Sequence, residues 1–221
     1  MADASEPTVR AAGEADVPFL IEAIIEAEKS GTDLIPYCRI FSLGEPELRE
    51  LLASILEEDF EGQELCISGF RIAEVDGEPA GAACAWIEGA EGLPSTLVKA
   101  NLLQHFLDAD RLAAAKPHFE RLGQLTLPRA AGAIQLESIY VRPAFRGRGI
   151  TSRILTEHLE KLRAKAPDCE RAQIILVKGN GNAQRAYEKL GFRITQERHA
   201  DDPELASIVP GDTKILMEKT L

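Results

Sequence analysis

The chain has 221 residues, of which 45% are hydrophobic and 28% charged, a composition typical of a folded globular protein and not of a disordered one. Its 36 acidic and 25 basic residues give a formal net charge of −11, which argues against non-specific nucleic-acid binding because such binding needs a basic face. No apolar run reaches the roughly 20 residues of a membrane span, and Met1–Pro7 lacks the basic flank and apolar core of a secretory leader. The length favours a single domain over residues 1–221. We expect a cytoplasmic protein that binds neither nucleic acid nor membrane.

The first quarter of the chain predicts one short strand and two helices. The strand covers Thr8–Ala12, and a helix follows from an Asp16 N-cap with Pro18 in its first turn to about Lys29. A loop then carries Pro36–Phe41. The spacing of leucines predicts a second helix from Glu45 to about Leu56.

An acidic run, from Glu57 to Glu64, follows the second helix. We interpret it as a solvated helix end, with an acidic patch facing the substrate as the alternative. Leu65–Val75 and Pro79–Ile87 then predict a hairpin, because Asp76-Gly77 between them is a typical hairpin turn.

Residues 91–129 predict a helical insertion ahead of the fourth strand. An acidic break interrupts it at Asp108–Asp110, and Pro117 is expected to limit the second helix. Its apolar side chains are too many for an exposed loop, so the segment covers something. It is either a packing element or homodimer contact, or a lid over the acceptor. These side chains are Leu102, Leu103, Phe106, Phe119 and Leu122.

The last third alternates strands and helices. A strand is predicted over Ala133–Val141, and a helix from Ile150 to about Ala166. Three further strands and a short helix complete the chain: Ile174–Val177, Ala183–Leu190, Phe192–Thr195 and Lys214–Met217.

A glycine-rich turn joins the strand Leu136–Val141 to the following helix. It reads Arg146-Gly147-Arg148-Gly149-Ile150-Thr151. Such a turn exposes backbone N–H groups at a helix N-terminus, where phosphate oxygens bind. It contains neither a Walker G-K-[ST] sequence nor G-x-G-x-x-G. Taken alone, it does not distinguish a phosphate site from a plain surface turn.

A second motif follows at a fixed distance, in the segment Asn180–Phe192. It has the form N-x-x-A-x-x-x-Y-x-K-x-G-F, with Tyr187 at the tyrosine position. The two motifs together resemble the GNAT superfamily of N-acetyltransferases, whose acyl-CoA loop is [RQ]-x-x-G-x-[GA]. The close match covers about a quarter of the chain. Thr151 departs from the loop pattern, and the spacing from Val177 to Asn180 is one residue short.

The resemblance implies an α/β (α+β) acyl-CoA N-acyltransferase fold with a mixed central sheet of six to seven strands flanked by helices. It also implies an acetyl-CoA-dependent N-acetyltransferase that moves an acetyl group to an amine by direct attack on the thioester, with acetyl-CoA as co-substrate and no metal. A catalytically weak acyl-CoA-binding or interaction module is the alternative. The residues expected to bind acetyl-CoA are Ile139, Tyr140, Val141, Arg146, Gly147, Arg148, Gly149, Ile150, Thr151 and Asn180.

Two side chains are candidates for the chemistry. An amine with a pKa near 10.4 is mostly protonated at pH 7 and must lose a proton before it attacks. Glu137 is the candidate base because it lies on the strand that would line the thioester, with a water chain as the alternative. Tyr187 is the candidate acid for the leaving thiolate. The acceptor stays open among small amines, amino acids, aminoglycosides and protein termini.

Cysteine and histidine spacing predicts no metal site. No two cysteines form a C-x-x-C pair, and no histidine follows one at a zinc-site interval. We expect four reduced thiols, at Cys38, Cys66, Cys84 and Cys169.

Overall fold

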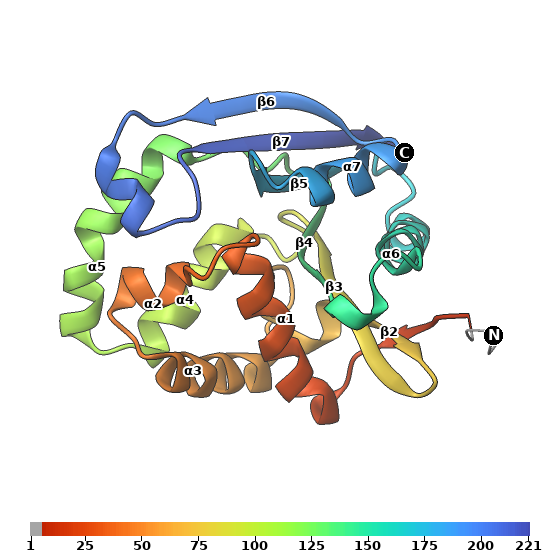
Figure 1. The fold of residues 1–221 in the computed structure, drawn as a ribbon, viewed down its shortest axis with the longest axis horizontal. Coiled ribbons are helices and arrows are strands. Elements are labelled where there is room, and N and C mark those ends of the chain that lie inside the picture. Colours follow the sequence, from red (N-terminus) through yellow and green to blue (C-terminus); the bar gives the residue numbers. More distant parts are fainter. Residues whose placement is uncertain (1–5) are drawn as a thin grey trace.

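The computed structural model describes residues 6–221, so most of the segment examined for a leader lies outside the described residues. Seven strands of the described chain form one sheet in the spatial order β1-β2-β3-β4-β5-β7-β6 (Figure 1). Only β4 and β5 are parallel, which confirms the expected mixed sheet. The strands are Thr8–Ala11 (β1), Phe70–Val75 (β2), Glu78–Ile87 (β3), Ile134–Val141 (β4), Arg171–Val177 (β5), Arg193–His199 (β6) and Thr213–Thr220 (β7).

Seven α-helices within the described residues flank this sheet. Among them, α1 packs on β3 and β4, and α6 packs on β2, β3 and β4. No helix of residues 6–221 is both long and apolar enough to cross a membrane. The helices are Val17–Lys29 (α1), Pro36–Phe41 (α2), Glu45–Glu58 (α3), Ser95–Phe106 (α4), Ala109–Leu122 (α5), Ile150–Lys165 (α6) and Gly181–Lys189 (α7).

Two hydrophobic cores lie on opposite faces of the sheet because side chains alternate along β2 and β3. Ile72 and Cys84 belong to the core shared with α1, α2 and α3, whereas Ala73 and Ala83 belong to the core under α6. The α6 face of β3 is lined by alanines, which lets that helix approach the sheet closely.

Three local predictions are wrong. Pro36–Phe41 is the short helix α2 and not a loop, and β2 begins at Phe70 and not at Leu65. The α5 helix continues through Pro117. Asp16 occupies the N-cap position of α1 but makes no capping bond there, because its carboxylate accepts hydrogen bonds from Arg10 and from the backbone of the preceding turn.

The helical insertion packs on its own chain. Its helices α4 and α5 contact α3 and α2 respectively (Figure 1). Leu102 and Leu103 of α4 are each 6% exposed and belong to the core of the α1 face. Phe119 of α5 keeps 47% of its surface exposed, although its ring meets that of Phe41 edge-on. The insertion is therefore a packing element of the described chain.

Candidate active site

The two parallel strands at the centre of the sheet separate along their length. Within the described residues, β4 and β5 pair only at Ile134–Ala172 and Gln135–Gln173. A bulge lies just beyond this point: the register between β3 and β4 shifts, and Ser138 adopts a positive φ of 50°. A bulge bends its strand, so β4 diverges from β5 and its edge from 136 to 141 is left without a strand partner on that side.

A cavity of about 1320 Å³ fills the space between the diverging strands. Its walls include both strands, the glycine-rich turn, α7, and the helices of the α1 face. An unpaired strand edge beside a cavity offers backbone N–H and C=O groups to an extended ligand. Ile139 and Val141 lie on this edge.

The glycine-rich turn lies at one end of the cavity and leads into α6. Gly147 and Gly149 have φ values of 80° and 75°, a region that side-chain-bearing residues rarely adopt. Gly149 is the N-cap of α6 and supplies no side-chain cap. The first N–H groups of this 16-residue helix, from Ile150 and Thr151 onward, are therefore available to an anion.

The arginines of this region differ in availability. Arg142 is held by Glu22, at 2.6 Å, and lies over the Phe19 ring. Arg146 donates from Nε to the carbonyl oxygen of Val141 at 3.1 Å, and its remaining nitrogens make no contact among the described residues. Arg148 lies over the ring of Phe145.

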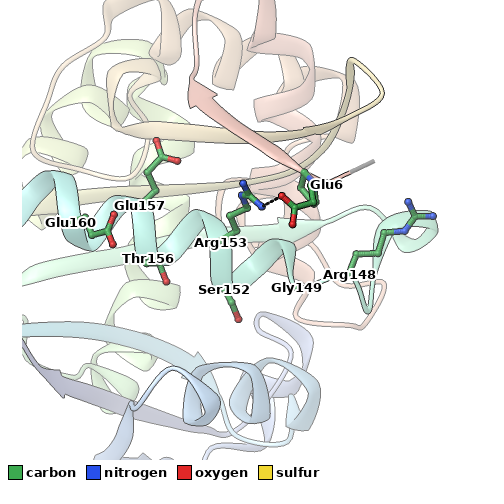
Figure 2. Close-up of a pocket in the computed structure, with 9 residues that line it drawn as sticks. Glu6, Arg148, Gly149, Ser152, Arg153, Thr156, Glu157 and Glu160 are labelled. Atoms are coloured by element: carbon green, nitrogen blue, oxygen red, sulfur yellow. Dashed lines mark ion pairs between the residues drawn. The ribbon is translucent and has the colours of Figure 1, made fainter. Parts of the chain in front are cut away.

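A second cavity, of about 630 Å³, lies beside the start of α6 and shares Gly149 and Ser152 with the first. Figure 2 shows Arg153 directed at Glu6, with which it forms an ion pair of 3.6 Å, and Ser152 and Thr156 directed to another side of the helix. The helix start thus presents backbone N–H groups, hydroxyls and the Arg148 guanidinium in one region.

The α7 residues of the second motif line the wall opposite β4. Tyr187 is 6% exposed, lines the cavity and packs edge-on against Phe192. Burial raises its pKa above the ordinary phenol value, so the hydroxyl keeps its proton. Asn180 caps α7 by accepting a hydrogen bond from Ala183 N at 3.3 Å. Its amide nitrogen makes no protein contact among residues 6–221.

Glu137 and Tyr140 are both engaged by other side chains. Glu137 forms an ion pair with Arg129, and both line the cavity. The hydroxyl of Tyr140 donates to Glu22 at 3.2 Å, and its backbone pairs with Ala82 of β3. Arg129 thus occupies the carboxylate of Glu137, which leaves its oxygens less available to an amine.

Four charged residues of the cavity wall were not identified from the sequence as site residues. Glu28 lies in the last turn of α1, Glu64 lies between α3 and β2, Lys99 lies on α4 and Lys214 is the second residue of β7. No motif surrounds any of them, and Glu64 was expected to be solvated. It is 5% exposed and pairs with Lys99, so the expectation that it is solvated is wrong.

Electrostatic shifts on this wall follow from burial and pairing. Burial alone would raise the pKa of Glu64, but Lys99 and Arg129 hold it below its usual value. Burial raises the pKa of Glu28 and lowers that of Lys214. No group of three or more acidic, histidine or cysteine side chains among the described residues is arranged to hold a metal ion.

The chain resembles solved structures over nearly its whole length. An N-acetyltransferase from Staphylococcus aureus Mu50 superposes with a TM-score of 0.65 at 16% identity, covering 96% of this chain and 100% of that one. A ribosomal-protein-alanine N-acetyltransferase from Brucella melitensis gives a TM-score of 0.55 at 16% identity, covering 97% and 99%. A putative acetyltransferase from Salmonella typhimurium, solved with its cofactor acetyl-CoA, gives 0.52 at 17% identity, covering 98% and 95%. At these identities the likeness establishes the fold.

The sequence itself was compared with families and with curated proteins. No curated protein matches the chain. The model of the acetyltransferase (GNAT) family matches residues 34–192, which include both motifs, the bulged strand and the start of α6. The chain therefore belongs to the acetyltransferase (GNAT) family.

Proposed function

We propose that this protein is an acetyl-CoA-dependent N-acetyltransferase that transfers the acetyl group to an amine by direct attack on the thioester. One observation carries the proposal. A single cavity runs from the uncapped N-terminus of α6, past the unpaired edge of β4, to the buried hydroxyl-bearing wall of α7. This order matches an acyl-CoA: the anion site suits its diphosphate, the strand edge suits its amide-containing arm, and the proton donor suits its thioester.

The residues of the cavity suit that donor. Backbone N–H groups from Gly147 to Thr151 would hold the diphosphate, assisted by the dipole of α6. The edge of β4 at Ile139 and Val141 would bond the amides of the pantetheine arm as an added strand does. The amide nitrogen of Asn180 faces the same arm from α7.

A protonated amine must lose two protons: one to a base before it attacks, and one from the positively charged nitrogen of the tetrahedral intermediate. The leaving sulfur gains one proton from a general acid, and the second proton lost by nitrogen restores that acid. The amine nitrogen gives up a proton, its lone pair forms the C–N bond, and the C–S bond breaks as the carbonyl re-forms. A backbone N–H near Val141 would stabilise the developing oxyanion. Tyr187, whose pKa burial raises, donates its proton to the leaving thiolate. The base is Glu137, a water chain, or the residue argued for below.

Two measurements on the purified protein test this proposal. Calorimetry should show binding of acetyl-CoA, and a thiol-release assay with a panel of primary amines should show release that depends on the amine. Binding without release for every amine would support the acyl-CoA-binding module instead. Absence of binding would overturn both interpretations.

A further inference from the structure

Besides Glu26, which pairs with Lys29, and Glu88, which accepts hydrogen bonds from Trp86 and Ser95, six charged side chains line the cavity on the side of α1 and the insertion: Glu28, Glu64, Lys99, Arg129, Glu137 and Lys214. Two opposite-charge pairs form among them. Glu64 pairs with Lys99 and Glu137 pairs with Arg129. Glu28 and Lys214 remain, and neither makes an ion pair or a side-chain hydrogen bond with any residue from 6 to 221. The wall therefore holds one unpaired acid and one unpaired base.

The fold positions these two side chains on the same wall. Glu28 lies in the last turn of α1, which packs on β4. Lys214 pairs with Val177, at the end of β5 that diverges from β4. Its neighbour Ile215 is buried in the α6 core, so Lys214 points to the opposite face of the sheet, where α1 lies. Each of the two influences the pKa of the other, yet their charged atoms are more than 4.0 Å apart.

The existing pairs also leave hydrogen-bonding capacity unused. Oε2 of Glu64 and Nε of Arg129 are buried and have no hydrogen-bond partner within the described part of the chain. The Glu64 side chain is only 7% exposed. Buried polar atoms without partners cost free energy. The wall thus offers acceptors for a cation, at Glu28 and Glu64, and donors for an anion, at Lys214 and Arg129.

We propose that the acceptor is a free amino acid, with its ammonium group at Glu28 and its carboxylate at Lys214. This inference rests on the proposed function and names its substrate class. A plain amine would pair with Glu28 but would leave Lys214 unpaired, beside the positive charge of the amine. A diamine would bring one more positive charge to the same wall. A zwitterion satisfies both residues at once. The insertion residues Phe119 and Leu122 border the same cavity and favour a small molecule over a protein chain.

The same placement assigns a proton transfer. The ammonium N–H bond breaks, the proton goes to the Glu28 carboxylate, and the nitrogen lone pair becomes available to the thioester. Glu28 suits this step better than Glu137 because no cation occupies its oxygens. Burial raises the pKa of Glu28, and a carboxylate with a raised pKa is a stronger base than one in water.

Matched acceptor pairs test the substrate class. Thiol release is measured with leucine, phenylalanine and glutamate, and with the decarboxylated amine and the amide of each. We expect at least one amino acid to show a kcat/KM at least tenfold above its amine and its amide. If amines, amides or N-terminal peptides have a kcat/KM equal to that of every amino acid, this inference is overturned and the N-acetyltransferase proposal still stands. Absence of acetyl-CoA binding would overturn the proposed function itself.

Substitution of Lys214 tests the carboxylate site. Lys214→Met keeps the length of the side chain and removes its charge, and it should raise KM for the preferred amino acid at least tenfold. The KM for the matching amine and the affinity for acetyl-CoA should not change. Lys214→Arg should keep the KM for the amino acid much closer to that of the wild type. Lys178→Met is the control, because Lys178 is half exposed and pairs with Glu197 outside this wall. An equal loss for amino acid and amine would remove Lys214 from the site.

Substitution of Glu28 tests the proton acceptor. Glu28 faces Lys99, Lys214, Glu137 and Glu64, and burial sets its pKa above that of an ordinary glutamate. The kcat/KM of the wild type should therefore fall with decreasing pH on a limb above the usual carboxylate range. Glu28→Gln should lower kcat at least tenfold and abolish that limb, while thermal unfolding confirms the fold. An unchanged acid limb in the folded variant would remove Glu28 from the mechanism.

Discussion

Tyr187 combines a tightly packed ring with a hydroxyl that has no competing partner among the described residues. The ring belongs to the core under α6 and meets Phe192 with centroids 6.5 Å apart. We predict that Tyr187→Phe lowers kcat by roughly 10²-fold, because a general acid contributes on that order. Acetyl-CoA affinity should stay similar, since the ring remains in place. Thiol-release kinetics and calorimetry measure the two effects. Wild-type turnover, with chemistry rate-limiting, would exclude Tyr187 as the acid.

Single residues divide into those that local sequence identifies and those that it does not. Tyr187 and Asn180 stand at fixed positions in one motif, so the resemblance names both as candidate site residues. Glu137 of β4 forms an ion pair with Arg129, which lies at the end of the insertion. Glu28 and Lys214 are separated by most of the chain and line the same cavity only in the folded protein. No local pattern predicts these placements, since they depend on tertiary packing.

In the proposed function, acetyl-CoA binding depends on the turn before α6. Gly149 has a φ of 75°, and a Cβ there would meet nothing within 4 Å. The constraint is therefore the backbone conformation and not space. We predict that Gly149→Val weakens acetyl-CoA binding at least tenfold, about 1.4 kcal/mol, because a β-branched residue strongly disfavours positive φ.

Gly149→Asn is the matched control for this element, because asparagine adopts the left-handed region more readily. It should retain most of the affinity in calorimetry. Equal affinity of the valine variant and the wild type, both folded, would contradict the assignment of this turn to the diphosphate.

The bulge of β4 is supported from α6 by a buried histidine. Where the register shifts, Ala83 of β3 has no direct partner on β4, and its carbonyl oxygen accepts a hydrogen bond of 2.9 Å from Nε2 of His158. Because a carbonyl oxygen only accepts, Nε2 carries the proton. His158 is 4% exposed, and burial lowers its pKa to about 4.

This histidine makes stability depend on pH. In the unfolded chain a histidine has a pKa near 6.5, whereas His158 in the folded protein has a pKa of about 4. Between these two pH values the histidine is therefore protonated in the unfolded state and neutral in the folded state. Stability should therefore decline as pH falls through this window, by about 2 kcal/mol at pH 5. Urea unfolding at pH 7 and pH 5 measures the loss.

His158→Gln isolates this contribution because it keeps a donor and removes the titration. Its loss of stability between pH 7 and pH 5 should be smaller than that of the wild type. His105→Gln, on the exposed surface of α4, should behave as the wild type does. An identical pH dependence in all three proteins would show that His158 is not the group responsible.

Elements were predictable in proportion to their length and regularity. The helices α1, α3 and α6 span three or more turns with a regular apolar stripe, and their bounds agree with the spacing of leucines and isoleucines. The six-residue α2 is too short to form by its own propensity and is held by packing against α3 and α5. Pro117 was expected to limit α5, yet the helix accommodates it in its interior.

At the scale of the whole molecule, the family resemblance predicted the mixed sheet of six to seven strands flanked by helices, which the structure confirms. It did not predict where the insertion lies, because residues 91–129 contain neither motif. The structure places that segment against α2 and α3, so the same helices that complete one core also border the cavity.

This arrangement distinguishes an integral packing element from a hinged lid. Leu102 and Leu97 lie on the same helix, α4, yet Leu102 is 6% exposed and belongs to the α1-face core, whereas Leu97 is 45% exposed. We predict that Leu102→Ala lowers the free energy of global unfolding by about 2–5 kcal/mol and that Leu97→Ala changes it by about 0.5 kcal/mol or less. Urea denaturation followed by fluorescence and by circular dichroism should show one shared transition in both variants. A lid would open as a separate unit of lower stability. In that case Leu102→Ala would leave the global midpoint unchanged and alter only KM for the acceptor, and the insertion would have to be assigned a gating role.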